Sequence, residues 1–463
     1  MNNTILLYFA LCLLFSTIEH RESNATEQVQ DHKQNTEQCS KAKLLNDESE
    51  SLRHVNRKKA FAKAEQAVSH ASKNNCRCEL ARAQKNLGIL YFFTGSYDDA
   101  RTHYEQALII YQELDDKAGV SSIYNNLALI YQEEGNFQTA LEHYQKSVEM
   151  DQALGDMEGV AATWSNMGNL HHYQGLFKEA LDFHTKALSV YESTGNHAEK
   201  MDCYLNIGAV LESNRLFIDA ADYYYKALFI ATELNDVYTR AILLFNLGGI
   251  EYQLGNGSSA LDFFIESLVL REELHDKVGM SNCLAYIGAV MEQMGQHDKA
   301  IHHYFRALKI DQEIGNARGI ASRFKKIGKS LLKNNEPLAA IEYLNQGLEL
   351  ALEINARPIV LESFEILIQS YLAIHNYQKA YDYLRLWAQL NSAMETGHEE
   401  LYPTLQQIRR AEQRGTASIF TGVPWWKWLL AGSIVVNLAL LTFFIMEAKK
   451  RRNRHFDPKH HQG

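Results

Sequence analysis

The sequence predicts an all-α protein built from antiparallel helix pairs, with one further apolar helix near its C-terminus. Three observations predict this class. The chain has only five prolines and 24 tyrosines among 463 residues, a composition that favours helices packed through aromatic side chains. Small residues recur at a constant step along most of the chain. Within each step, apolar residues follow the spacing of helix faces and not the alternation of strands.

The constant step is 40 residues. Alanine keeps one register nine times between Ala60 and Ala380, which indicates stacked copies of a single supersecondary unit. A polar residue, an apolar residue and a small residue recur in the same frame. They read Asn86-Leu87-Gly88, Asn126-Leu127-Ala128, Asn166-Met167-Gly168, Asn206-Ile207-Gly208 and Asn246-Leu247-Gly248.

Each unit contains the pattern of two helices. Leu87 and Tyr91 share one face of a first helix, and Ala100, Tyr104 and Leu108 share one face of a second. A Gly or Ala on one helix allows the bulky residue of its partner to approach closely. About eight such antiparallel pairs are predicted over residues 52–390.

Turn residues separate the predicted helices. The turn inside a unit needs a residue with positive φ, and glycine supplies it most easily. Glycines stand there at Gly95, Gly135, Gly175, Gly255 and Gly295. Longer turns are expected between units, at Asp115-Asp116, Gly155-Asp156, Gly195-Asn196, Asn235-Asp236 and Gly315-Asn316.

The repeat resembles that of the tetratricopeptide repeat (TPR) family. Trp164, Met167, Gly168, Ala180 and Ala187 fit the aromatic, large apolar and small places of one copy. The resemblance covers about residues 55 to 390, and the 40-residue unit is similar to the longer variant found in kinesin light chains and bacterial membrane-anchored signalling proteins. The chain departs from the family pattern because its units lack the terminal proline and the last unit is degraded. The resemblance implies a superhelical solenoid whose concave wall is lined by the first helix of each unit.

Residues 1–18 are predicted to be a signal peptide. The apolar run from Ile5 to Phe15 has the length of a signal-peptide core and is too short to span a bilayer. An uncleaved anchor is the alternative, because no Lys or Arg precedes the run. Residues 19–51 are polar and predicted to form a stalk.

A transmembrane helix is predicted over residues 425–447. Between Trp428 and Met446 no residue is charged and Asn437 is the only amide, and tryptophans cluster at the start as in an interfacial belt. Basic residues follow directly and place the tail, residues 448–463, in the cytoplasm by the positive-inside rule. Residues 391–424 would supply a capping helix and a tether. The repeats would then be periplasmic or extracellular, anchored by a single C-terminal span.

The six cysteines are too scattered for a disulfide framework. Cys203 and Cys283 occupy the same repeat position and are expected on buried helix faces too far apart to bridge. Cys39, Cys76 and Cys78 surround the first predicted helices. Either one disulfide forms among these three in an oxidising compartment or they remain free thiols.

No motif for catalysis stands out from the repeat background. Residues 255–260 match a dinucleotide fingerprint on paper, but a helix precedes them and Gly255 fills an ordinary turn. His171-His172 and His302-His303 are adjacent pairs that face different directions on a helix, without further ligands at metal spacing. We therefore predict a protein that is not an enzyme and has no cofactor or metal. The net charge of -10 disfavours nucleic acid as a partner.

Two sets of residues are candidate binding sites. The first is a ladder of amides at one repeat position, which offers donors and acceptors to the main chain of an extended peptide. The alternative is that these asparagines only pack against neighbouring units. The second is a basic patch that could receive an acidic segment, or could be an ordinary solvated face. The ladder consists of Asn86, Asn126, Asn166, Asn206 and Asn246, and the patch of Lys325, Lys326, Lys329 and Lys333.

Two functions fit this layout. In the first, the protein is a membrane-anchored extracytoplasmic scaffold that binds a peptide or protein partner in its concave groove. In the second, it is a sensor or receptor subunit of a bacterial signalling system that lacks its own output domain. The sequence discloses neither the ligand nor the oligomeric state.

Overall fold

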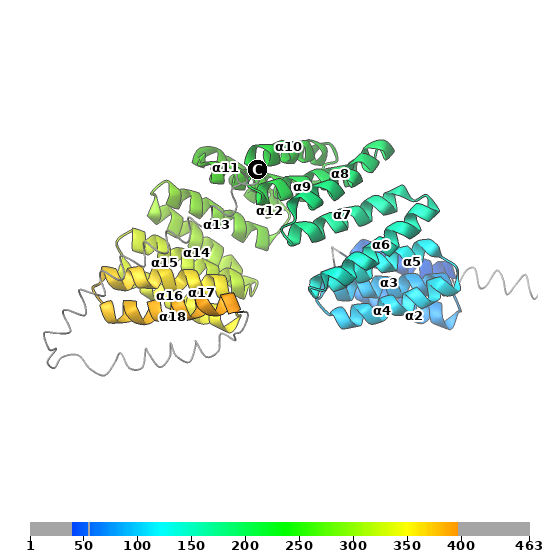
Figure 1. Cartoon of the computed structure of the whole chain (residues 1–463), viewed down its shortest axis with the longest axis horizontal. Helices are drawn as coiled ribbons and strands as arrows, with labels where there is room; N and C mark the ends of the chain where they lie inside the picture. The colour runs from blue at the N-terminus through cyan, green and yellow to red at the C-terminus, as the bar shows by residue number, and fades with distance from the viewer. Residues whose placement is uncertain (1–38, 54–55, 397–463) are drawn as a thin grey trace, which may run out of the picture. The chain divides into compact units, whose positions relative to one another are not determined.

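The computed structural model describes residues 39–53 and 56–396, and every regular element within them is a helix (Figure 1). The chain divides into two compact units, Met1–Ile314 and Gly315–Gly463. Each unit is a stack of antiparallel helix pairs, as the period predicts.

The described residues of unit 1 form a helical segment over residues 39–52 and thirteen further helices. They are α2 (Arg57–Lys73), α3 (Arg77–Phe93), α4 (Tyr97–Glu113), α5 (Lys117–Glu133), α6 (Phe137–Leu154), α7 (Met157–Tyr173), α8 (Phe177–Thr194), α9 (His197–Ser213), α10 (Phe217–Glu233), α11 (Val237–Leu254), α12 (Gly257–Glu273), α13 (Lys277–Gln293) and α14 (His297–Glu313). The helices of unit 2 are α15 (Ala317–Lys333), α16 (Pro337–Glu353), α17 (Arg357–Ala373) and α18 (Tyr377–Thr396).

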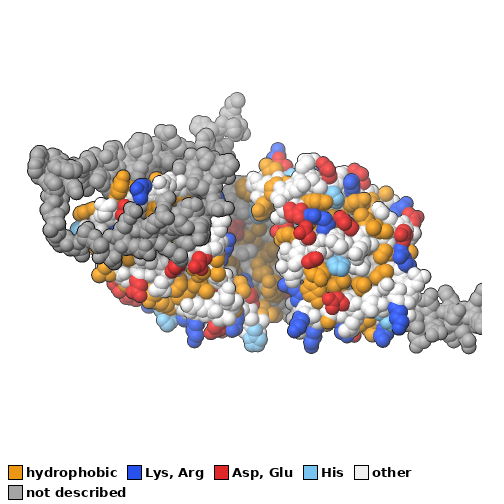
Figure 2. Space-filling view, turned by 90° about the horizontal axis from the view of Figure 1, so that it is seen from below, with side chains coloured by type: hydrophobic (Ala, Val, Ile, Leu, Met, Phe, Trp, Pro, Cys, Tyr) orange, Lys and Arg blue, Asp and Glu red, His pale blue; other side chains and the backbone are white. Residues whose placement is uncertain are grey.

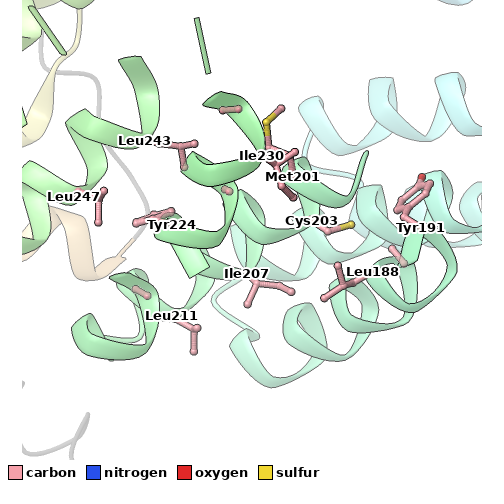
Figure 3. Packing of buried hydrophobic residues seen from close by; sticks show 14 of the residues in the cluster. Leu188, Tyr191, Met201, Cys203, Ile207, Leu211, Tyr224, Ile230, Leu243 and Leu247 are labelled. Atoms are coloured by element: carbon pink, nitrogen blue, oxygen red, sulfur yellow. The ribbon is translucent and has the colours of Figure 1, made fainter. Parts of the chain in front are cut away.

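The predicted close crossing of small and bulky residues is confirmed. A Cβ atom added to Gly88 would lie 2.4 Å from the Tyr104 ring, and one added to Gly208 would lie 2.5 Å from the Tyr224 ring. Tyr224 is fully buried and belongs to an apolar cluster shared by successive pairs (Figure 3). Cys203, from α9, lies in the same cluster and is a buried free thiol, as expected.

The two kinds of turn have the same length, so the prediction of longer turns between units is wrong. Inside a pair, α3 ends at Phe93 and α4 begins at Tyr97; between pairs, α4 ends at Glu113 and α5 begins at Lys117. Helices of 17 residues with three-residue turns fill the 40-residue period. Asp115 adopts a φ of 52° between pairs, as glycines do inside most pairs.

Side-chain caps are more frequent at the first helix of a pair than at the second, although Asn136 also caps the second helix α6. The Asp116 carboxylate accepts a hydrogen bond from the Gly119 amide at 2.9 Å, and Asp156 accepts one from Gly159 at 2.9 Å. These Asp residues open the first helix of a pair and satisfy an otherwise unpaired donor. Leu176, which opens the second helix α8, supplies no side-chain cap.

The N-terminal boundary of the repeats differs from the prediction. Residues 39–52, the second part of the predicted polar stalk, form a helix that buries Ala42 and Leu45. A disulfide joins Cys39 to Cys76, with 5.5 Å between their Cα atoms, and Cys78 is a free, exposed thiol. The buried face of this helix consists mostly of small and polar residues, so its sequence lacks a clear apolar stripe.

Several predicted segments lie outside the described residues. They are the signal peptide, the first part of the stalk, the transmembrane helix and the basic tail, and most of the predicted capping helix and tether. None of the helices that the structure describes combines the length and the apolar character needed to cross a bilayer.

Candidate functional site

The five asparagines of the ladder occupy one position on the first helices of five successive pairs, all in unit 1. These helices are α3, α5, α7, α9 and α11, and several of them contact the next in the series. The repeat therefore places the five asparagines at equivalent positions on successive first helices, and we refer to them as the amide row. Their surroundings differ along the row.

The amide of Asn86, at the start of the row, is buried and already hydrogen-bonded. Asn86 is only 1% exposed. It donates to Oδ1 of Asn46 at 3.5 Å and accepts from the Arg53 guanidinium at 3.4 Å. Asn46 stands 40 residues earlier, so the row begins one unit before the predicted first member. Asn86 matches the alternative in which the amide packs against a neighbouring unit.

Two further members are partly exposed and already hydrogen-bonded. Asn166 donates to Oδ1 of Asn125 on the preceding first helix at 3.0 Å. Asn246 has a side-chain hydrogen bond with the Tyr224 hydroxyl, from the preceding pair. An amide has four hydrogen-bonding positions, so both retain capacity for a ligand.

Asn126 and Asn206 are the open members of the row. Both side chains are partly exposed, and neither has a hydrogen-bond partner among the residues that the structure describes. They flank Asn166 on either side. The stretch from Asn126 to Asn206 therefore presents the amides with most capacity for an extended main chain.

The charged residues at the N-terminal end of the row are paired. Arg82 donates to Glu50 at 2.7 and 2.9 Å and contacts Asp47 at 2.7 Å. Burial alone would raise the pKa of Glu50, but the bonds and the charge of Arg82 outweigh it and hold the pKa below its usual value. Arg82 is thus engaged inside the protein and does not offer an open clamp for a ligand carboxylate.

One carboxyl beside the row was not anticipated from the sequence. Asp202 lies one helical turn before Asn206 on α9 and is exposed. Desolvation by the surrounding protein raises its pKa to about 6, and the carboxylates of Glu199 and Asp236 add to the shift. The spacing of Glu199 and Asp202 on one helix could have indicated this cluster, but the approach of Asp236 from the next pair could not.

The buried crossing between α7 and α8 has different residues from that of the next pair. In the next pair, the Tyr224 hydroxyl donates to Glu212 at 2.7 Å. The corresponding residues here are His184 and His172. His184 is fully buried, and neither ring nitrogen has a hydrogen-bond partner in the described part of the chain. Burial, reinforced by nearby His172, lowers the pKa of His184 to about 4.

The lysines of the predicted basic patch lie on α15 in unit 2. Lys325 forms an ion pair with Glu362 of α17, and its side chain is only 12% exposed. Lys326, Lys329 and Lys333 also have interaction partners. Lys325 is thus held in an ion pair within unit 2, whereas Lys329 and Lys333 are exposed.

The described residues offer hydrogen bonding and no arrangement for metal binding. Within residues 39–53 and 56–396, no three His, Cys, Asp or Glu side chains are grouped closely enough to hold a metal ion. His171 stacks on Phe183, with 5.4 Å between ring centroids, and His172 bonds to Ser213 at 2.8 Å. These adjacent histidines diverge to different partners.

The fold and the repeat chemistry define a class of repeat protein. A family profile described as tetratricopeptide repeat matches residues 79–153, 159–233, 239–313 and 282–353. The chain belongs to the tetratricopeptide repeat family. No curated protein matches the chain in sequence.

Solved structures with a similar fold are distant in sequence. A signal transduction ATPase with a tetratricopeptide repeat sensor, from Pyrococcus horikoshii, has 14% identity and a TM-score of 0.55, covering 74% of this chain and 54% of that one. The apo quorum sensor NprR from B. thuringiensis has 13% identity and a TM-score of 0.53, covering 75% and 98%. A Rap protein complexed with Competence and Sporulation Factor has 14% identity and a TM-score of 0.50, covering 78% and 100%. At these identities the likeness shows the fold alone.

Proposed function

We propose that unit 1 binds an extended segment of a peptide or protein along the amide row, and that the protein is a non-enzymatic scaffold. The observation that carries this proposal is the open stretch of the row. Asn126 and Asn206 lack partners among the described residues, and Asn166 between them uses only part of its capacity. Amides spaced along a surface suit the alternating donors and acceptors of a main chain.

We further propose that the repeats lie outside the cytoplasm and are anchored by the apolar segment around Trp428 to Met446. The Cys39–Cys76 disulfide supports this location, because disulfides persist in oxidising compartments and are rare in the cytosol. The basic residues after Met446 support the same orientation.

The binding proposal is tested by removing the three central amides. Peptides selected from a random library on the full chain in nonionic detergent serve as probes. Asn126, Asn166 and Asn206 are replaced together by Ala. Affinity should fall about 100-fold, because each hydrogen bond contributes about 1 kcal/mol. The matched control replaces Gln106, Gln145 and Gln152.

These three control glutamines are exposed amides of the second helices, away from the row. Their replacement by Ala should leave the affinity within twofold. An equal affinity for the Asn variant and the wild type, with helicity intact by circular dichroism, would reduce the row to a packing feature.

A second candidate is a sensor subunit of a signalling system. It is favoured by two proteins of similar fold, one with a tetratricopeptide repeat sensor and the other a quorum sensor. Purification of the full chain in detergent separates the candidates. A sensor subunit should recover a membrane kinase or regulator, whereas a scaffold should recover extracytoplasmic proteins.

A further inference from the structure

The second helices of two successive pairs in unit 1, α10 and α12, carry a set of large exposed apolar side chains that the proposed peptide site does not use. We name it the outer apolar stripe. It consists of Ile218, Tyr225 and Phe229 on α10, and of Ile265 and Val269 on α12. Both helices pack against α11 (Figure 1). Ile218 is 74% exposed and Phe229 is 68% exposed, so neither side chain contributes much to the core.

Other repeats of the same chain provide an internal comparison. At the position of Tyr225 and Ile265, the earlier pairs have Glu105, Gln145 and Thr185. All three of these residues are exposed. The fold therefore tolerates polar residues at this repeat position, and apolar residues there are not needed for packing.

The position of Phe229 and Val269 shows the same change. Glu149, Ser189 and Lys309 stand there on α6, α8 and α14. Single exposed apolar residues also occur at these two positions elsewhere, Ile109 on α4 and Phe305 on α14, but only α10 and α12 have apolar residues at both. On the face that Figure 2 draws, seen from below the view of Figure 1, apolar side chains of the described residues are interspersed with charged ones and form no comparable concentration that can be assigned to α10. Concentration of large apolar residues on two consecutive outer helices marks a contact surface.

Charge restricts what can cover this stripe. Asp222 and Glu233 flank it on α10, and Asp262 and Glu266 flank it on α12; all four are exposed. The one exposed lysine among them, Lys226, lies over the Tyr223 ring at 4.4 Å. The stripe is therefore an apolar surface with an acidic border.

We propose that the outer apolar stripe docks an amphipathic segment of a partner protein in which apolar side chains are bordered by Lys or Arg. A second copy of this chain would bring the same four carboxylates against one another, and an anionic membrane surface would be repelled. A partner with a basic border instead gains from both the apolar contact and the charges. The protein would then hold two partners, one along the amide row and one on its outer face.

The test uses the full chain in nonionic detergent and two synthetic amphipathic helical peptides. The peptides share the same apolar residues, and one has Lys where the other has Glu. The stripe variant carries Y225Q, F229S, I265Q and V269S, which are polar replacements like those at equivalent positions of other repeats. The Lys peptide should bind the wild type at least about tenfold more tightly than the stripe variant, because aromatic and aliphatic anchors dominate such interfaces.

Two controls make the result specific. I109S and L338Q together remove exposed apolar residues outside the stripe and should leave binding unchanged. D222N, D262N and E266Q should remove the preference for the Lys peptide over the Glu peptide. Equal binding of the Lys peptide by the wild type and the stripe variant would overturn the proposal. So would self-association in sedimentation that the stripe variant abolishes, because the occupant would then be a second copy.

Discussion

The pair α7 and α8 and the pair α9 and α10 share one backbone plan but close their cores differently. In α9 and α10, Tyr224 is fully buried and its hydroxyl bonds to Glu212. In α7 and α8, His184 fills the same place, and neither of its ring nitrogens has a hydrogen-bond partner among the described residues. The comparison teaches that the repeat fixes the shape of each crossing, whereas the polar groups inside it vary from pair to pair.

Replacing the buried ring of each crossing by Ala should give the largest difference in the free energy of unfolding between the two pairs. Tyr224→Ala should lower the free energy of unfolding by about 3 to 5 kcal/mol, because it opens a cavity and leaves the partly buried Glu212 carboxyl without its donor. His184→Ala should cost less than half as much, since it also removes a polar ring that is buried without partners. Urea unfolding followed by circular dichroism measures both. Equal losses would show that the two crossings are energetically alike.

Acidification should affect the α7 and α8 pair selectively. The folded protein holds the pKa of His184 near 4, below the usual value of about 6.5, so protonation favours unfolding. The contribution of neutral His184 to stability is complete above about pH 6.5 and is lost as the pH falls toward 4. By pH 5 the loss amounts to roughly 2 kcal/mol.

The measurement for this pH effect is the unfolding midpoint between pH 7 and pH 5, for the wild type and for His184→Phe. The Phe variant keeps a ring in the crossing and cannot be protonated. Its midpoint should fall less than that of the wild type over this range. Parallel falls in the two proteins would assign the acid sensitivity to other groups.

Introducing the Tyr–Glu hydrogen bond of α9 and α10 into α7 and α8 should remove the difference in stability between the two crossings. His184→Tyr combined with His172→Glu restores the residues found at Tyr224 and Glu212. It should stabilise the protein by about 1 to 2 kcal/mol at pH 7, because an unpaired buried ring is exchanged for a hydrogen-bonded one. His184→Tyr alone is the control and should gain less. A loss of stability in the double variant would mean that this crossing cannot accept a tyrosine.

The caps should show the smallest effect and should be the same in both pairs. Asp156 and Asn196 open α7 and α9, and each accepts a hydrogen bond from the backbone amide three residues later, at 2.9 and 3.3 Å. Replacing either by Ala should cost about 1 kcal/mol. Leu176→Ala at the uncapped start of α8 serves as the control. A clearly larger cost at one of the two caps would indicate a role beyond capping.

The sequence predicted the helix pairs and their crossings well, because both follow from a period that repeats in one register. The glycine and aromatic contacts, such as Gly88 with Tyr104, were predictable since only a small residue permits that approach. The first helix was missed because its buried face includes the polar residues Asn46 and Ser49, which give no amphipathic pattern.

The state of the amide row could not be predicted from the sequence. Asn86 and Asn206 occupy the same repeat position, but only Asn86 is buried against a preceding Asn. Likewise, the two shortest ion pairs of Arg82 are with Asp47 and Glu50, which stand more than 30 positions earlier on another helix. Such partners depend on which side chains three-dimensional packing brings together, and the period alone does not specify them.

Site-specific photo-crosslinking in cells tests the binding surface most directly. A crosslinking amino acid is placed at Ala162, one turn before Asn166 on α7, or at Thr185 on the outer face of α8; both positions are exposed. The account predicts a discrete extracytoplasmic adduct from position 162 that the triple change of Asn126, Asn166 and Asn206 to Ala abolishes, and no adduct from position 185. An adduct at 185 and none at 162, or an adduct at 162 that survives the triple change, would contradict it.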